Sequence, residues 1–114
     1  MEIVRPLISD AHRAFHDQCA DFAAREIAPH AERWEQAGSF DRALWKRAGD
    51  AGLLGPGYPA ALGGLGGDVM HSVVATEAFM ASGTSPGVVV GLGTLELALP
   101  AIMALGDPEQ QRRF

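Results

Sequence analysis

The clearest structural signal in the chain is residues 9–36, which read SDAHRAFHDQCADFAAREIAPHAERWEQ. Small and apolar residues recur there every three or four positions, which predicts one buried helical face; they are Ala11, Phe15, Cys19, Phe22, Ala23 and Ile27. Ser9 suits the N-cap because its hydroxyl can accept from free backbone N–H groups. Pro29 should kink or restart this helix, since it has no N–H to donate. Gly38 suits the position just after the helix.

Three more helices and a short terminal helix are predicted, at residues 41–51, 68–81, 86–105 and 107–113. Asp41, Asp68 and Asp107 precede three of them as N-caps. The 86–105 helix is apolar all round, which indicates burial on several sides, and Pro100 should bend it. Residues 53–67 are too rich in Gly and Pro for a helix but carry several Leu and one Tyr, so we expect a structured loop.

The fold class follows from these patterns. Only Val88–Val90 favour a strand, and one strand cannot form a sheet. The sequence therefore predicts an all-α fold, with residues 1–114 forming a single helical domain of bundle-like packing. The chain closes on residues 106–114, a helix start followed by barely two turns. We therefore expect it to be the front piece of a larger protein.

Composition excludes several classes of function. The net charge of −5 argues against nucleic-acid binding and against anionic membrane surfaces. Cys19 is the only cysteine, so no disulfide framework and no cysteine-based zinc site is expected. No uninterrupted apolar run of about 18 residues occurs, so no membrane span is expected. A reducing cytoplasm is the natural location.

Two short patterns resemble nucleotide-binding turns. Val88–Gly93 has the strand-like valines and two glycines of such a turn, but Glu96 stands where the third glycine belongs. Gly55–Ala60 fits the same spacing, although its two prolines remove N–H groups that a phosphate would need. We interpret the first as a helix with small residues at a packing surface and the second as loop architecture.

Several single residues are candidates for chemistry. His12 and His16 have the spacing of two metal ligands on one helical face. No Glu accompanies them in the H-E-x-x-H pattern, and His30 and His71 lie on other elements. The sequence therefore favours solvated surface histidines and predicts no metal site.

Glu77 lies on the apolar stripe of the 68–81 helix, where an unpaired carboxylate is costly. It is either a catalytic acid or base, or one half of an ion pair with Arg25 or Arg47, and the ion pair is favoured. The aromatic residues Trp34, Trp45 and Tyr58 could line a pocket, but core packing is more common. No catalytic residue can be named.

Four segments, taken together, resemble the acyl-CoA dehydrogenase family. Ala28-Pro29-His30-Ala31 stands at the kink of the first helix. Residues 52–55 are followed by Pro59 and by Gly63-Gly64-Leu65-Gly66. Glu77 then matches the acidic position of the family's third helix, and residues 106–114 resemble its closing G-x-x-E-Q-K-x-R-Y segment. The order and spacing agree from about residue 8 to residue 114, which identifies the chain as the family's N-terminal helical domain.

The resemblance implies that a β-barrel-like middle domain and a C-terminal four-helix domain, both absent from this chain, complete the enzyme. FAD would lie between those two domains, and the glutamate base would lie beyond the first domain. The intact protein would desaturate an acyl-CoA thioester in fatty acid metabolism and pass electrons to electron-transfer flavoprotein or a similar acceptor. It would be a homo-oligomer. This chain alone should be inactive and should bind no FAD.

The same resemblance implies that the first domain walls the acyl pocket. Val89, Gly93 and Leu97, spaced four apart, are the expected substrate-lining residues. Gly91 and Gly93 either leave room for a long or bulky acyl group or permit close helix packing, and packing is favoured. Ala60–Leu62 replace acidic and aromatic residues usual in the family. This departure leaves open a flavin-dependent monooxygenase or acyl-CoA oxidase of the same fold, and a free-standing helical interaction module is a further alternative.

Overall fold

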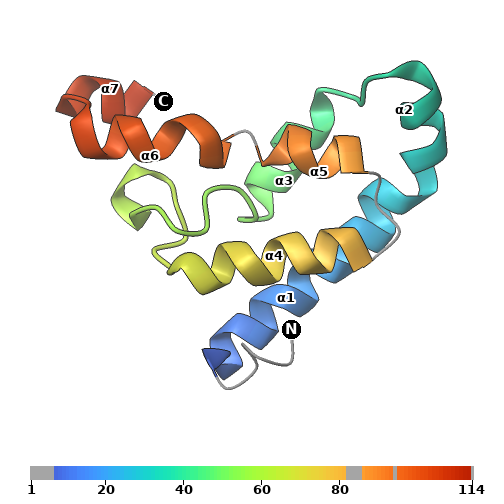
Figure 1. The fold of residues 1–114 in the computed structure, drawn as a ribbon, viewed down its shortest axis with the longest axis horizontal. Coiled ribbons are helices and arrows are strands. Elements are labelled where there is room, and N and C mark those ends of the chain that lie inside the picture. Colours follow the sequence, from blue (N-terminus) through green and yellow to red (C-terminus); the bar gives the residue numbers. More distant parts are fainter. Residues whose placement is uncertain (1–6, 82–85, 94, 114) are drawn as a thin grey trace.

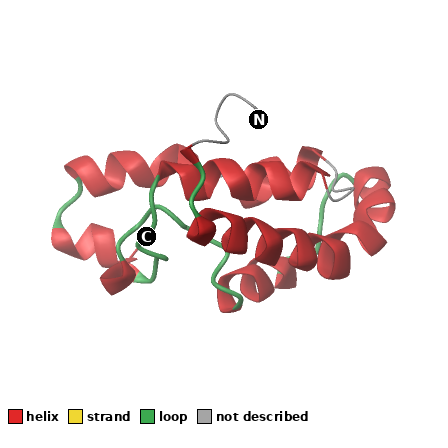
Figure 2. Ribbon diagram, turned by 90° about the horizontal axis from the view of Figure 1, so that it is seen from below, coloured by secondary structure: helices red, strands yellow, loops and turns green. Residues whose placement is uncertain are grey.

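The computed structural model describes residues 7–81, 86–93 and 95–113, and no strand occurs among them. Helices follow one another in a slab of 40 × 36 × 21 Å (Figures 1 and 2). Their bounds are α1 Asp10–Phe22, η2 Ala23–Ile27, η3 Ala28–His30, α2 Ala31–Ala37, α3 Ala43–Asp50, η4 Ala60–Leu62, α4 Val69–Ala81, α5 Pro86–Leu92, α6 Leu95–Leu105 and α7 Pro108–Arg113. The predicted all-α class is confirmed.

The predicted first helix is continuous but changes type around Pro29. The α-helical α1 widens into the π-helical turn η2, and the 3₁₀ turn η3 contains Pro29 before α2 begins. The proline cannot donate into an α-helical ladder, so the hydrogen-bond pattern resets there. The Ser9 hydroxyl accepts from the His12 N–H at 3.2 Å. Gly38 ends α2 with a φ of 74°. The predicted cap, kink and end are therefore confirmed.

The core lies where α1 packs across α4, with α3 and α5 closing it (Figure 1). Its members are Phe15, Cys19, Phe22, Ala23, Ile27, Trp34, Leu44, Ala48, Leu53, Val74, Ala75, Ala78, Phe79, Val88 and Leu92. The predicted stripe of the first helix is buried except at its start. There Ala11 is exposed and its neighbour His12 is buried instead.

Two of the three predicted aspartate N-caps are confirmed. Asp68 Oδ1 accepts from the His71 N–H at 3.2 Å, and Asp107 Oδ1 accepts from the Gln110 N–H at 2.8 Å. Each aspartate also donates its own N–H to the side chain three residues on, as in a capping box.

The prediction for Asp41 is wrong. The α3 helix begins one residue later, with Arg42 at the N-cap position and no side-chain cap. The Asp41 carbonyl accepts from the Leu44 N–H at 2.9 Å in a turn that precedes the helix. The Asp41 carboxylate instead lies 3.8 Å from the Arg33 guanidinium.

The predicted single helix 86–105 is also wrong. The structure has two helices, α5 and α6, and the first ends at Leu92, whereas Pro100 lies inside α6 without ending it. Gly91 and Gly93 each lower helix propensity by about 1 kcal/mol relative to alanine, so the break falls beside them. Residue 94, between the helices, lies outside the described residues. So do residues 82–85, between α4 and α5.

The Gly-rich segment 53–67 is the structured loop that the sequence predicts. Its backbone bonds to itself, with Gly66 N–H donating to Tyr58 O at 2.8 Å and Gly67 N–H to Pro56 O at 2.9 Å. A Cβ at Gly64 would lie 2.8 Å from Tyr58 Cβ, so only glycine lets these two parts of the loop touch.

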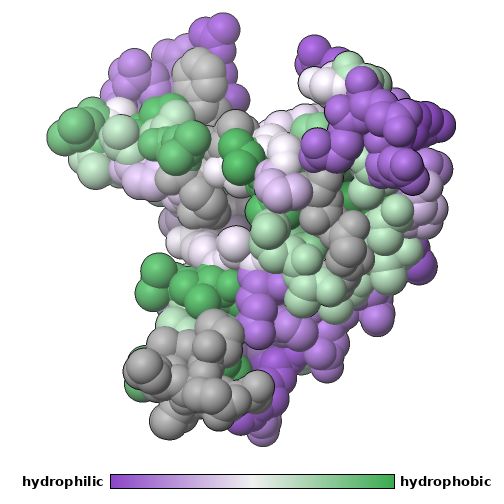
Figure 3. Space-filling view, turned by 45° about the vertical axis from the view of Figure 1, so that its right-hand side comes forward, coloured by the Kyte–Doolittle hydropathy of each residue, from purple (hydrophilic) through white to green (hydrophobic). Residues whose placement is uncertain are grey.

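The α6 and α7 helices form an arm that stands away from the core (Figure 1). Leu97 is 78% exposed and Leu105 is 87% exposed, and apolar side chains gather on this arm at the upper left of Figure 3. By length and composition alone, residues 86–105 could also cross a bilayer. That finding qualifies the expectation that no stretch could span a membrane, although the segment is divided between α5 and α6.

Candidate functional site

The short helix α5 presents a different surface on each of its sides. Val88 and Leu92 point into the core and are buried. Val89 and Gly93, one turn apart, border a cavity shared with α4 and with loop residues 53–56. Gly91 lies against Phe40. The helix therefore lies between the core and two cavities, one bordered by Val89 and Gly93 and the other beside Gly91 and Phe40.

The structure brings together two of the three predicted substrate-lining residues. Val89 and Gly93 line the same small cavity, of about 60 Å³, with Leu54, Thr76 and Phe79 among its other walls. Leu97 lies on α6, beyond the break, and its side chain is exposed. The even spacing of four that suggested one face assumed an unbroken helix, which the structure does not have.

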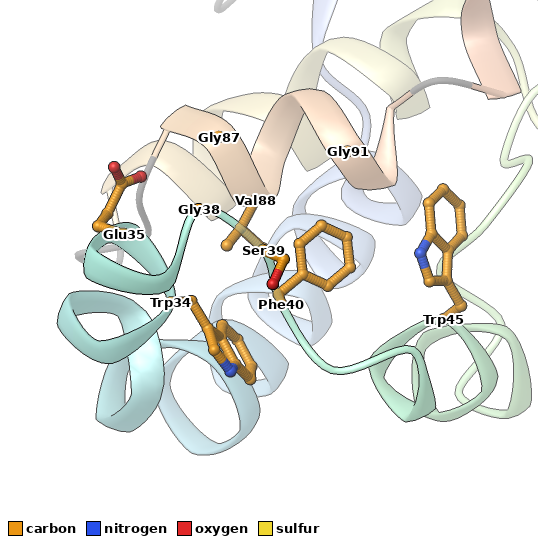
Figure 4. A pocket seen from close by; sticks show the side chains of 9 residues that line it. All are labelled: Trp34, Glu35, Gly38, Ser39, Phe40, Trp45, Gly87, Val88 and Gly91. Carbon is orange, nitrogen blue, oxygen red and sulfur yellow. The ribbon is translucent and has the colours of Figure 1, made fainter.

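A larger hollow, of about 460 Å³, is lined by aromatic rings (Figure 4). Trp34 comes from α2, Phe40 from the connection to α3, and Trp45 from α3, while Gly87 and Gly91 form the wall on the α5 side. Trp34 is at once a core residue, 4% exposed, and a lining residue. Tyr58 lines a different cavity, between the Gly-rich loop and α6. Phe40 has no periodic pattern around it, so no feature of the sequence indicated its role.

The two nucleotide-like patterns form no phosphate cradle. Val88–Leu92 lie within α5, and the Gly93 N–H donates to the Val89 carbonyl at 2.9 Å. In the other pattern, the Tyr58 N–H donates to the Gly55 carbonyl at 3.2 Å. Helix packing and loop architecture, the interpretations preferred from the sequence, are therefore confirmed.

The ion pair predicted for Glu77 is wrong. Its side chain is half-buried, and within the described residues it has no ion pair with Arg25 or with Arg47. Arg47 Nε instead lies 2.9 Å from the Glu26 carboxylate. The α4 helix turns Val74, Ala75, Ala78 and Phe79 inward, and Glu77 is left at the edge of that buried face.

His12 is not the solvated surface histidine that its sequence suggested. It is 6% exposed, and its Nε2 lies 2.8 Å from Asp68 Oδ1. His71 Nδ1 lies 3.0 Å from the same oxygen, and the two imidazole rings meet edge to face at 4.5 Å. Hydrogen bonds from His71 and then from His12 lower the pKa of Asp68 to about 2. His16 lies apart from this group, 3.2 Å from Asp17.

Both histidines occupy the third position of a helix. The Ser9 N–H donates to His12 Nδ1 at 2.9 Å, and the Asp68 N–H donates to His71 Nδ1 at 3.1 Å. Each histidine thus takes the place of the Glu or Gln in a capping box. The repeated spacing, Ser-x-x-His and Asp-x-x-His, was visible in the sequence, but nothing local indicated that the two helix starts would meet.

Comparison with known proteins agrees with this helical architecture. The family model described as acyl-CoA dehydrogenase, N-terminal domain, matches residues 9–114. The mitochondrial long-chain specific acyl-CoA dehydrogenase of Rattus norvegicus is 34% identical over 112 residues, which are 97% of this chain and 25% of that protein. The chain therefore spans about a quarter of the length of the curated relatives it matches.

Two solved structures show the same arrangement of helices. A probable acyl-CoA dehydrogenase from Mycobacterium abscessus is 40% identical, with a TM-score of 0.88 over 93% of this chain and 28% of its own. A structure described as the electron transferring flavoprotein of Acidaminococcus fermentans is 28% identical, with a TM-score of 0.84 over 94% of this chain and 28% of its own.

Proposed function

We propose, from the premise that this chain belongs to the acyl-CoA dehydrogenase family as its N-terminal domain, that it forms one wall of an acyl-CoA pocket. The reaction would be α,β-dehydrogenation of an acyl-CoA thioester by a protein of the relatives' length. The observation that carries this proposal is the surface of α5 and α6. Val89 and Gly93 border a cavity, and Leu97 on the next helix presents a bare apolar side chain.

The contribution of these residues to the proposed function is physical rather than chemical. Apolar side chains exclude water and favour an acyl chain over a polar ligand, at about 25 cal/mol per Å² of apolar surface buried. We assign FAD to the other domains of the intact protein, as the resemblance to the family implies, and derive no chemical step from it. When bound in the intact protein, FAD would accept the hydride.

The chain by itself should be inactive and should not hold FAD. Titration of the 114-residue chain with FAD, followed by flavin fluorescence, tests this expectation. Weak or undetectable quenching supports it, whereas tight binding of one FAD per chain would contradict it.

The partners belong to the same proposal. Acyl-CoA would be the substrate in fatty acid metabolism, and electron-transfer flavoprotein or a similar carrier would be the acceptor. The exposed apolar arm of α6 and α7 would pack against the other domains or against a second subunit of a homo-oligomer, because bare apolar surface of this kind marks an interface. A cytoplasmic location is consistent with the free, buried Cys19.

The acyl wall is tested best at Leu97, since an exposed position accepts a larger side chain without disturbing the core. In a protein of the relatives' length, Leu97→Trp should raise KM for long acyl-CoA substrates more than for short ones. Val69→Trp, at a similarly exposed position at the start of α4 and outside the α6–α7 arm, is the matched control. Equal effects of the two substitutions at every chain length would contradict the assignment of Leu97.

A further inference from the structure

We propose that His12, Asp68 and His71 bind a divalent transition-metal ion, with zinc favoured by the ligand set. One nitrogen from each imidazole and one carboxylate oxygen lie within 4.8 Å of one another. Asp68 Oδ1 is the shared centre, 2.8 Å from His12 Nε2 and 3.0 Å from His71 Nδ1. The three residues come from α1, from the residue before α4, and from α4 itself.

The donor set matches what zinc takes in proteins. Two imidazole nitrogens and one carboxylate oxygen provide three ligands, and a water completes a tetrahedral site that is open on one side. In such a site adjacent ligand atoms are separated by about 3.3 Å, given metal–ligand bonds of about 2.0 Å. The two separations from Asp68 Oδ1 are a few tenths of an ångström shorter, and the two imidazole nitrogens lie within 4.8 Å of each other. Binding therefore needs the imidazole nitrogens to adjust and Asp68 to make a small outward movement. That carboxylate is 59% exposed and free to make it.

The surroundings hold the two imidazoles in place. His12 is buried against the core, and His71 packs edge to face on it with Phe15 behind, at a ring separation of 5.5 Å. A Cβ at Gly67 would lie 2.6 Å from His71 Nδ1, so the missing side chain lets the backbone rest against this ring. Ligands that are fixed before the ion arrives lose little conformational entropy on binding it.

Protonation also favours the ion. A metal at His12 Nε2 requires the ring proton on Nδ1, and Ser9 Oγ lies 3.0 Å away to accept it. Such a second hydrogen bond on the far ring nitrogen commonly orients a metal-ligating histidine.

Binding of the ion costs two hydrogen bonds from backbone N–H groups. The Ser9 N–H donates to His12 Nδ1 and the Asp68 N–H donates to His71 Nδ1. Both bonds are lost when the ion is bound, because the first nitrogen then carries the ring proton and the second binds the metal. Both amides lie at helix starts near the surface, where water can replace the lost acceptor.

The test uses the tag-free 114-residue chain after treatment with a chelator. Isothermal titration with Zn²⁺ should show one ion bound per chain. Titration with Co²⁺ should give the intense visible absorption of a tetrahedral site, and this measurement needs no variant. Asp68→Asn and His71→Gln should each raise the apparent Kd for Zn²⁺ at least tenfold. His16→Ala, which removes the neighbouring half-exposed histidine of α1, should leave Kd unchanged.

Circular dichroism of each variant separates loss of a ligand from loss of the fold. If Asp68→Asn remains helical yet binds Zn²⁺ as tightly as the unmodified chain, the assignment is wrong. The same holds if the unmodified chain binds no Zn²⁺, or if His16→Ala abolishes binding. None of these outcomes depends on the acyl-CoA proposal.

Discussion

Gly91 of α5 lies so close to the ring of Phe40 that a Cβ at residue 91 would be 2.8 Å from Phe40 Cζ. The glycine therefore serves the packing of α5 against the connection between α2 and α3. Gly93 differs, because its nearest neighbour is the Val89 carbonyl of its own helix turn, 3.1 Å from a Cβ at residue 93. The sequence left two roles open for these glycines, room for an acyl group or close helix packing, and close packing applies at Gly91.

A glycine-to-alanine substitution should have opposite effects on stability at Gly49 and at Gly91, because only Gly91 lies against Phe40. Gly49→Ala should stabilise by up to about 1 kcal/mol, because alanine favours a helix and its Cβ would meet only Leu54 Cδ1 at 3.7 Å. Gly91→Ala should instead destabilise by about 1 kcal/mol or more through overlap with the Phe40 ring. Urea unfolding of both variants checks this.

A double-mutant cycle then separates the ring contact from helix propensity. Combined with Phe40→Ala, the Gly91→Ala substitution should lose at least about 0.5 kcal/mol of its penalty. Strict additivity of the two changes would show that the overlap does not govern the effect.

The buried position of Leu44 predicts a large penalty for its truncation. Its side chain is 0% exposed, so Leu44→Ala should lower the free energy of unfolding by about 2–5 kcal/mol through lost burial and a new cavity. The matched control is Leu105→Ala at 87% exposure, which should change it by less than about 0.5 kcal/mol. Similar losses in urea melts of the two variants would contradict the core described above.

Cys19 should be inert while the chain is folded. Burial raises the pKa of its thiol from 9.0 to about 12, and the side chain is 0% exposed. Because the thiolate is the reactive form, a coloured disulfide reagent at pH 8 should label it only as fast as the protein opens. In concentrated guanidinium, one thiol per chain should react at once. Rapid labelling of the folded chain would mean that the face of α1 that carries this residue is not covered by α4.

The low pKa of Asp68 predicts how its contribution to stability depends on pH. Its folded-state value of about 2 is below the ordinary 3.8, so the ionised form is favoured by folding. That contribution is present above pH 4 and is lost as the pH falls through about 2. The Tm difference between the unmodified chain and Asp68→Asn should therefore shrink from pH 5 to pH 2. Asp21→Asn, which changes an exposed carboxylate of α1, provides the control.

Much of the secondary structure was predictable because it depends on residues close together in the chain. Ser9, Asp68 and Asp107 cap their helices through the backbone three residues on. The prediction of Asp41 as an N-cap was wrong because the residues around it suit both a turn and a helix start. The prediction of one helix at residues 86–105, bent at Pro100, was wrong. Proline breaks a helix more strongly than glycine does, so the sequence pointed to Pro100, yet the break lies beside Gly93.

The candidate site was predicted less well, since its members meet across long stretches of chain. Val89 and Gly93 share a cavity with loop residues 53–56 and with α4, and only the packing of α5 brings them there. Trp34 and Trp45 were named in the sequence, but Phe40, which lies between them, was not.

Local spacing and the order of short motifs were enough to predict most of the helices, most of their caps and buried faces, and the family. The tertiary structure alone decided which side chains meet. Arg47 pairs with Glu26 rather than Glu77, and His12 reaches Asp68 across 56 positions of chain. Such contacts depend on the angle and rotation at which α1 and α4 pack, and a helical period specifies a buried face but not the partner that covers it.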